Sequence, residues 1–331
     1  MIDAARDALD SYWVLMPVKV LAVLALFLTF PLLVGYMEHK VMAHMQARLG
    51  PMEAGRFHGV LQLVADGIKF VQKESIIPTA ADKWVFALAP AVALIPGILV
   101  FGFIPYGRDL VPIRSDVGLF VTLALSSVSV IGVLMAAWSS ANKYSLMGGI
   151  RAAAQLIAYE LPLVLAAAAV AMQAGSADLA VIVERQDRVP NALVPWLTVA
   201  LVVFFVSGLA ELTRPPFDMP VADSELVFGH LTEYTGLRFA FFLLTEYAGI
   251  VSQSAIAATL FLGGWKGPFL DGPWWLAGKV LALSFVVIWA RSTYPRLRED
   301  QLQSFAWLRL VPVSLALLLV VGFLKVYEVG I

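Results

Sequence analysis

Cysteine is absent from this sequence of 331 residues. A chain without cysteine has no disulfide bond, no thiolate ligand for an iron–sulfur cluster and no attachment point for c-type haem. None of the four histidines stands in a long apolar segment, where an axial haem ligand is expected. We therefore predict no metal site and no redox centre in this chain. Electrons for any redox reaction must come from another protein.

Charge is also scarce, since Asp, Glu, Lys and Arg make up 14% of the residues against roughly 25% in soluble domains. The formal net charge of −1 gives no electrostatic reason to expect nucleic acid as a partner. Neither a G-x-x-x-x-G-K loop nor a G-x-G-x-x-G fingerprint occurs in the sequence. The chain is therefore not expected to bind NADH by either of these devices.

Apolar residues, in contrast, make up 60% of the chain. A helix that spans a bilayer needs about 20 mostly apolar residues, because hydrocarbon offers no partner for free backbone groups. Segments that satisfy this requirement lie at about 13–35, 84–104, 117–138, 152–174, 193–212, 239–262, 274–290 and 308–325. We predict an all-α integral membrane protein with about eight transmembrane helices, forming a single membrane domain over residues 1–331.

The basic residues indicate an orientation. Most of the Lys and Arg residues flank or occupy the loops after the first, third, fifth and seventh apolar segments. Cytoplasmic loops of membrane proteins carry such an excess of positive charge. We predict that these four loops are cytoplasmic and that both termini lie outside, with the chain in the cell inner membrane.

An amphipathic segment follows the first apolar one, at about residues 56–74. Phe57, Val60, Leu61, Val64, Ile68 and Val71 recur there at helical spacing, opposite polar and charged residues. The pattern predicts an interfacial helix. Its apolar face could rest on lipid or on the ends of spanning helices, and its polar face could contact a soluble partner.

Three acidic residues fall within or at the end of apolar segments: Glu160, Glu211 and Glu246. Each costs about 2.5–3.5 kcal/mol on an insertion scale, so their presence needs a reason. One reason is proton transfer, because buried carboxyl groups in membrane proteins form proton relays. The other is structural pairing with an arginine, for which the candidates are Arg151, Arg214, Arg238 and Arg291.

The predicted cytoplasmic loop at about residues 212–237 is unusually acidic for its side of the membrane. It contains Asp218, Asp223, Glu225 and Glu233, together with prolines that break a helix. Irregular backbone among apolar flanks is typical of a segment that lines a water-filled cavity. An ordinary solvated loop is the alternative.

Several motifs of this chain carry a family resemblance. These are EHKVMAHMQARLGP and LVADGIKFVQKE within 38–74, WSSANKYSLMGGIRAAAQLIAYE at 138–160, AELTRPPFD with SELV and TEY within 210–234, and RSTYPRLREDQL at 291–302. Together they resemble the H subunit of bacterial NADH:quinone oxidoreductase, respiratory complex I. The likeness covers nearly the whole chain in order.

The resemblance implies a non-redox subunit at the joint of the membrane arm and the peripheral arm. Its partners are other membrane-arm subunits and the soluble quinone-site subunits, which carry the iron–sulfur clusters, while flavin also resides in a partner. Quinone is the substrate. The implied function is to form the quinone tunnel with these partners and to link quinone reduction to proton translocation through buried carboxylates.

The resemblance also assigns roles to residues. The proton path consists of Glu160, Glu211, Glu246, Asp218, Asp223, Glu225 and Glu233. Their charge partners are Arg151, Arg214 and Arg291. The quinone tunnel is framed by Glu38, His39, Lys40, Arg48, Gly50, Pro51, Asp66, Lys69 and Lys73. Contacts to the soluble arm fall on Arg296, Arg298 and Asp300.

This chain departs from the family pattern at four positions. His39 stands where the family has Arg, so a permanent charge is replaced by a group that titrates near pH 6.5. Val221 occupies the place of a usual acid, which leaves the acidic series one member short. Met52 replaces a common Asn, and Leu308 follows Trp307 where Lys is usual. These changes could mean that the chain belongs to a second copy of the complex or to a specialised complex.

Other functions stay open at this point. The corresponding subunit of a ferredoxin-, hydrogen- or formate-dependent complex has a similar membrane fold with a different donor module. A stand-alone ion transporter also buries acids, but it typically shows an internal repeat, and none is evident in this sequence. A purely structural membrane anchor leaves the three buried glutamates to be explained by ion pairs.

Overall fold

The computed structural model describes residues 12–186, 190–221 and 223–327, and no strand occurs among them. Its long helices are α2 (Tyr12–Met45), α4 (Lys83–Phe103), α5 (Gly118–Ser139), α6 (Lys143–Ala174), α8 (Pro195–Glu211), α10 (Gly236–Phe261), α11 (Pro273–Thr293) and α13 (Val311–Val326). The shorter ones are α3 (Gln62–Gln72), α7 (Leu179–Glu184), η1 (Asn191–Leu193), α9 (Asp223–Leu226), η2 (Gly229–Leu231), α12 (Glu299–Phe305) and the π-helix η3 (Ala306–Leu310).

Seven helices in the described part of the chain are long and apolar enough to cross a membrane, and the 17-residue α8 is a shorter apolar helix. Seventeen residues are at the lower end of what a spanning helix needs. The prediction of an all-α membrane protein with about eight transmembrane helices is therefore confirmed, and the chain is a multi-pass membrane protein.

Several boundaries differ from the prediction. Helix α2 continues ten residues past the predicted end at position 35, and α6 begins nine residues before the predicted start at 152. The prediction followed apolar composition alone, whereas residues 36–45 contain no Gly or Pro that would end a helix. The last span likewise starts at Glu299, because α12, η3 and α13 follow one another without a break.

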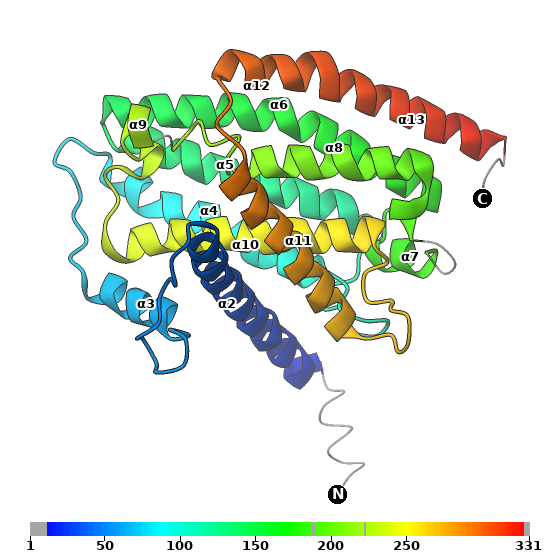
Figure 1. Ribbon diagram of the computed structural model, residues 1–331, viewed down its shortest axis with the longest axis horizontal. Coiled ribbons are helices and arrows are strands. Elements are labelled where there is room, and N and C mark those ends of the chain that lie inside the picture. The colour runs from blue at the N-terminus through cyan, green and yellow to red at the C-terminus, as the bar shows by residue number, and fades with distance from the viewer. Residues whose placement is uncertain (1–11, 187–189, 222, 328–331) are drawn as a thin grey trace, which may run out of the picture.

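The helices form one bundle with two oblique members (Figure 1). Helices α4, α5, α6, α8 and α10 run roughly side by side, and α13 lies along α6 and α8. Helices α2 and α11 cross this group at a slant and pack against α10 and each other. The largest buried cluster joins side chains from all of these spans, including Phe27, Phe101, Tyr159, Phe204 and Phe261.

Four loops gather at one end of the bundle, which we call the loop end. They contain residues 46–82, 140–142, 212–235 and 294–298. Hydrogen bonds connect them: Ile76 N to Thr235 Oγ1 at 3.0 Å, Asn142 Nδ2 to Glu233 Oε1 at 2.7 Å, and Leu297 N to Pro216 O at 3.0 Å. These are the four loops predicted to share one side of the membrane.

The loop of residues 212–235 is held directly against α6. The buried side chain of Gln155 donates to the carbonyl oxygens of Ala210 and Phe217, each at 2.7 Å. Gly148 faces Gly229, and a Cβ on Gly148 would lie only 2.7 Å from Gly229 Cα. This loop is therefore packed against the bundle and is not an ordinary solvated loop.

Helix α3 lies beside the loop end and is shorter than the predicted 56–74, since residues 53–61 form turns and bends. It packs against α10 and α2, with Phe70 and Phe239 5.7 Å apart between ring centroids. Val64, Ile68 and Val71 are exposed, so the apolar face is available to lipid. Whether the helix also contacts a soluble partner stays a prediction.

Candidate functional site

A polar cavity of about 360 Å³ lies inside the loop end, between α4, α5, α6, α8, α10 and the loop of residues 212–235. We call it the loop-end cavity. Its polar lining consists of Ser126, Ser129, Glu211, Thr213, Arg214, Asp218, His230, Thr245, Glu246, Tyr247, Ser252, Gln253 and Arg291. The cavity therefore brings together acids, arginines and hydroxyl groups that are far apart in the sequence.

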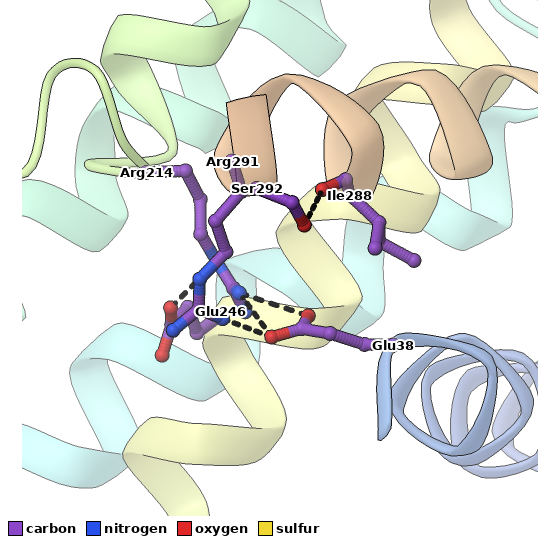
Figure 2. Close-up of polar contacts among 6 residues, drawn as sticks. All are labelled: Glu38, Arg214, Glu246, Ile288, Arg291 and Ser292. Carbon is purple, nitrogen blue, oxygen red and sulfur yellow. Dashed lines mark hydrogen bonds and ion pairs between the residues drawn. The ribbon is translucent and has the colours of Figure 1, made fainter. Parts of the chain in front are cut away.

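An ion-pair cluster of Glu38, Arg214, Glu246 and Arg291 lies at the cavity (Figure 2), and all of its members except Glu38 line the cavity. Arg214 Nη1 donates to both carboxylate oxygens of Glu38, at 2.8 and 2.9 Å, and its Nε lies 2.8 Å from Glu246 Oε1. Arg291 Nη1 donates to Glu38 Oε1 from the other side. The four side chains come from α2, the loop after α8, α10 and α11, and their formal charges cancel.

Burial makes this cancellation necessary. Glu38 is 3% exposed and Arg214 is 2% exposed, and a buried charge that loses its partner destabilises a protein strongly. Burial by itself lowers the pKa of the Arg214 guanidinium, but the Glu246 and Glu38 carboxylates outweigh this effect and raise it above its ordinary value. The guanidinium also lies 5.0 Å from the centre of the Tyr247 ring. Arg214 is therefore a permanent cation at the centre of the cluster.

A second group of acids lies deeper in the bundle. Glu211, the last residue of α8, lines the cavity near the side chain of Ser126 on α5, whose hydroxyl donates to Leu123 O. The hydroxyl of Ser127 donates to Glu160 Oε1 from the adjacent position on α5. Glu160 acts electrostatically on Glu211, so the two carboxyl groups are neighbours. Two predicted path residues are thus brought together, with serine side chains beside them.

The other predicted path residues line the rim of the loop end. Asp218 also lines the cavity and forms an ion pair with Arg296 at 3.0 Å. Glu225 pairs with Arg151 at 2.7 Å, and Arg151 also lies 3.6 Å from Glu299.

Glu233 accepts the hydrogen bond from Asn142 that connects two of the loops. Asp223 begins α9, but its side chain lies outside the described residues.

The predicted tunnel residues are dispersed. Glu38 belongs to the ion-pair cluster, whereas its neighbour His39 is exposed. Lys40 Nζ donates to Pro51 O and lies 3.2 Å from Met52 Sδ, which holds the loop after α2 against that helix.

The remaining members lie on the surface of this region. Gly50 has φ +69°, which favours glycine, and a Cβ there would approach Ala43 Cβ to 2.9 Å. Arg48 Nε donates to Gln46 Oε1, Asp66 lies 3.8 Å from Lys69, and Lys73 is exposed at the end of α3.

The predicted contacts to a soluble arm stand at the loop end. Arg298 and Asp300 are largely exposed and lie 3.2 Å from each other. Arg296, in contrast, is already engaged with Asp218 inside the chain. The same guanidinium therefore connects the loop after α11 to the loop after α8, and its contact with a soluble subunit stays a prediction.

Sequence reasoning missed several cavity residues. Ser126 and Ser127 read as ordinary small residues of a span, and Tyr247 follows Glu246 without any distinguishing pattern. His230 is buried, and its Nδ1 has no hydrogen-bond partner among the residues that the structure describes. Among the described residues, no group of three His, Asp or Glu side chains could hold a metal ion.

His230 supplies a prediction about pH. Burial lowers the pKa of its imidazole from 6.5 to about 4, so the packed loop binds this proton less readily than the opened loop. The loop therefore loses stability as pH falls from above 6.5 towards 4, by about 2 kcal/mol at pH 5. Hydrogen–deuterium exchange of residues 223–235 at pH 7 and pH 5 measures this opening after correction for the intrinsic exchange rate.

The control for this measurement is His230→Phe. Phenylalanine keeps the edge contact with Phe242, whose ring centroid lies 5.7 Å away, and it does not titrate. The acids of the cavity are the same in both proteins. The difference between their two pH dependences of hydrogen–deuterium exchange is therefore due to His230. Equal pH dependence in the two proteins would contradict the prediction.

Comparison with known proteins matches this architecture to one family. The family model described as NADH dehydrogenase matches residues 18–322. The H subunit of the NADH-quinone oxidoreductase of Dehalococcoides mccartyi is 43% identical over 95% of this chain and 88% of its own length. The H subunit numbered 2 of Geobacter metallireducens is 41% identical over 95% of this chain and 96% of its own length. The H subunit of Bacillus cereus is 43% identical over 90% of this chain and 90% of its own length. The chain belongs to the family of NADH-quinone oxidoreductase H subunits, as its motifs predicted, and is part of an enzyme complex.

Proposed function

We propose that this chain forms the membrane wall of a quinone tunnel and transmits the charge changes of quinone reduction to a proton path through the loop-end cavity. The observation that carries the proposal is the common lining of that cavity. It joins the ion-pair cluster around Glu38 to Glu211, which lies beside Glu160. A buried cavity with both balanced charges and protonatable groups can couple charge to proton movement.

The chemistry requires this coupling. Quinone takes up two electrons and two protons to become quinol, and the electrons come from the iron–sulfur clusters of partner subunits. Before the protons arrive, negative charge develops on the quinone oxygens. In a medium of low dielectric constant, such a charge acts strongly on neighbouring ionised groups. Any ionised side chain that faces the tunnel therefore responds to the reduction.

Arg291 is the member of the cluster best placed to respond. Its side chain is 33% exposed, whereas that of Arg214 is 3% exposed and fixed by three short contacts. Negative charge in the tunnel draws Arg291 away from Glu38, and the cluster then carries a net negative charge. Proton uptake within the cavity restores neutrality. Glu246, which is half-buried and faces the cavity, is the nearest carboxylate of the cluster to take up that proton.

From Glu246 the path continues along the cavity to Glu211 and then to Glu160. The hydroxyl of Ser127 donates to Glu160, and the side chain of Ser126 lies near Glu211. The rim acids Asp218, Glu225 and Glu233, together with Asp223, connect this path to the loop end. Arg151 and Arg296 balance two of them.

The proposal extends to the tunnel and to the partner surfaces. Lys40 and the loop after α2, with Gly50, Pro51 and α3, form the tunnel mouth beside the exposed apolar face of α3, where quinone enters from lipid. Arg298 and Asp300 contact the soluble quinone-site subunits. The loop end is cytoplasmic, the termini are outside, and the complex resides in the cell inner membrane. No cofactor binds covalently or by metal ligation in this chain.

An equivalent subunit of a ferredoxin-, hydrogen- or formate-dependent complex is disfavoured, because the relatives described above are named for the NADH-dependent enzyme. Affinity purification of the tagged chain from membranes discriminates between these assignments. Mass spectrometry of the partners and inhibitor-sensitive NADH:quinone activity are measured on the same sample. NADH-binding and iron–sulfur subunits with activity are the expected result. Hydrogenase-type partners, or recovery of the chain alone, would overturn the proposal.

A further inference from the structure

A second cavity lies away from the loop-end cavity, on the side of the bundle where α11 diverges from α8 and α13. It has a volume of about 700 Å³. Figure 1 shows α11 crossing the bundle obliquely. The last turns of α8 and α11 both line this cavity. We call this cavity the α8–α11 groove. Its volume falls within the range of about 300–1,000 Å³ that ligand sites occupy.

The walls of the groove are apolar. Phe205, Val206 and Leu209 form one side, and Val286 and Trp289 form the other. All five belong to the last turns of two spanning helices, and Val286 and Trp289 are exposed in the isolated chain. A surface of this kind in the membrane accommodates a hydrocarbon chain.

The charge in the lining of the groove is positive. Arg309 is its only charged residue, and no acid lines it. Arg309 is exposed, and within the described part of the chain it forms neither a hydrogen bond nor an ion pair. An unpaired arginine on a membrane helix is costly, so a partner of negative charge is expected.

Two further features indicate that the groove is a ligand-binding site. Tyr294 and Ser304 also line the groove and present exposed hydroxyl groups. Arg309 lies in η3, a π-helical segment between α12 and α13. π-Helical segments are rare and frequently occur at functional sites. The arginine thus stands where the helical hydrogen-bond pattern is locally altered.

We propose that the α8–α11 groove binds an anionic glycerophospholipid of the membrane. One acyl chain lies between α8 and α11, and the phosphate pairs with Arg309 while Tyr294 and Ser304 donate hydrogen bonds. Basic pockets between membrane helices bind anionic lipid headgroups by the same chemistry. The site is separate from the quinone and proton path, since the two cavities share no lining residue.

The test uses the purified, assembled complex after removal of loosely bound lipid. It is incubated with phosphatidylglycerol or with phosphatidylcholine, each carrying a photoreactive diazirine on one acyl chain. After illumination, mass spectrometry measures the lipid attached to the peptides of α8 and α11. We expect the anionic probe to label these peptides about fivefold more than the zwitterionic one, the factor that one interfacial cation provides.

Two variants and a control complete the experiment. Arg309→Gln should reduce labelling by phosphatidylglycerol to the level of phosphatidylcholine, and Val206→Trp should fill the groove and reduce both. Arg108→Gln, at an exposed arginine of the loop after α4, should change neither. Equal labelling by the two probes, or unchanged labelling in Arg309→Gln, would overturn the proposal. Absence of label on α8 and α11 would also overturn it and would indicate that a polypeptide covers the groove. Labelling is independent of turnover, so this result does not depend on the proposed function.

Discussion

Arg214→Met is expected to prevent normal accumulation of the folded chain. The substitution leaves the Glu38 and Glu246 carboxylates on one side of the cluster without their shared cation, and only Arg291 remains for Glu38. Breaking a buried ion pair by removing one partner typically costs about 3–5 kcal/mol. That loss is comparable with the whole stability of many domains, about 5–15 kcal/mol. Native gels of solubilised membranes should therefore show much less assembled complex.

Two further variants make this result specific. Arg214→Lys keeps the charge but cannot donate to both oxygens of Glu38 while contacting Glu246, so an intermediate loss is expected. Arg108→Met, at an exposed position of the loop after α4, should leave the amount of complex unchanged. Normal accumulation of Arg214→Met would show that the cluster contributes little to stability.

The helical architecture could be predicted from the sequence because hydrocarbon imposes it. A span of about 20 apolar residues has few alternatives to a helix, so the number and order of the spans followed from composition. The family also followed, because its motifs extend over most of the chain. The residues at which the spans begin and end could not be predicted from composition. Helix α2 continues beyond its apolar run, where no Gly or Pro ends it, and carries Glu38 into tertiary ion pairs that composition does not reveal.

The pairing within the site could not be predicted, since it depends on long-range contacts. Glu38 and Arg291 are 253 positions apart in the sequence, and Asp218 and Arg296 are 78 apart. Charged residue types indicated candidates, but no local pattern says which acid faces which arginine. Glu38 was therefore assigned to the tunnel, and Arg296 to a partner surface, although both form internal ion pairs. The roles assigned to the path and tunnel residues stay predictions.

The ion pairs around Glu38 also differ in kind from the acids around Glu211. The cluster contains two acids and two arginines, so it is balanced and stabilises the packing of α2, α10 and α11. Glu160, in contrast, accepts a hydrogen bond from Ser127, and Glu211 lies near the side chain of Ser126. No structural ion pair within the described residues accounts for these two acids. Proton transfer is the function that their placement favours, and they are the residues on which to test it.

Glu211→Gln is expected to stop coupled turnover while leaving the fold intact. Glutamine has nearly the same shape as glutamate, but it cannot carry a proton. Loss of a proton-transfer group typically slows a reaction by about 100-fold or more. In proteoliposomes that contain the purified complex, both NADH:quinone reduction and the acidification it drives should fall to below about a tenth. Glu160→Gln should act in the same direction, because Glu160 neighbours Glu211 on the proposed path.

The matched control is Glu184→Gln, which makes the same chemical change at an exposed glutamate at the end of α7. Both activities should be retained there, whereas Glu211→Asp, which restores a carboxyl group on a shorter side chain, should recover part of them. Thermal stability and the amount of assembled complex must match the unmodified protein, so that a loss of activity reports proton transfer and not unfolding. If Glu211→Gln and Glu160→Gln both retain quinone reduction and proton translocation, the two carboxyl groups are structural, and the proton path must run elsewhere.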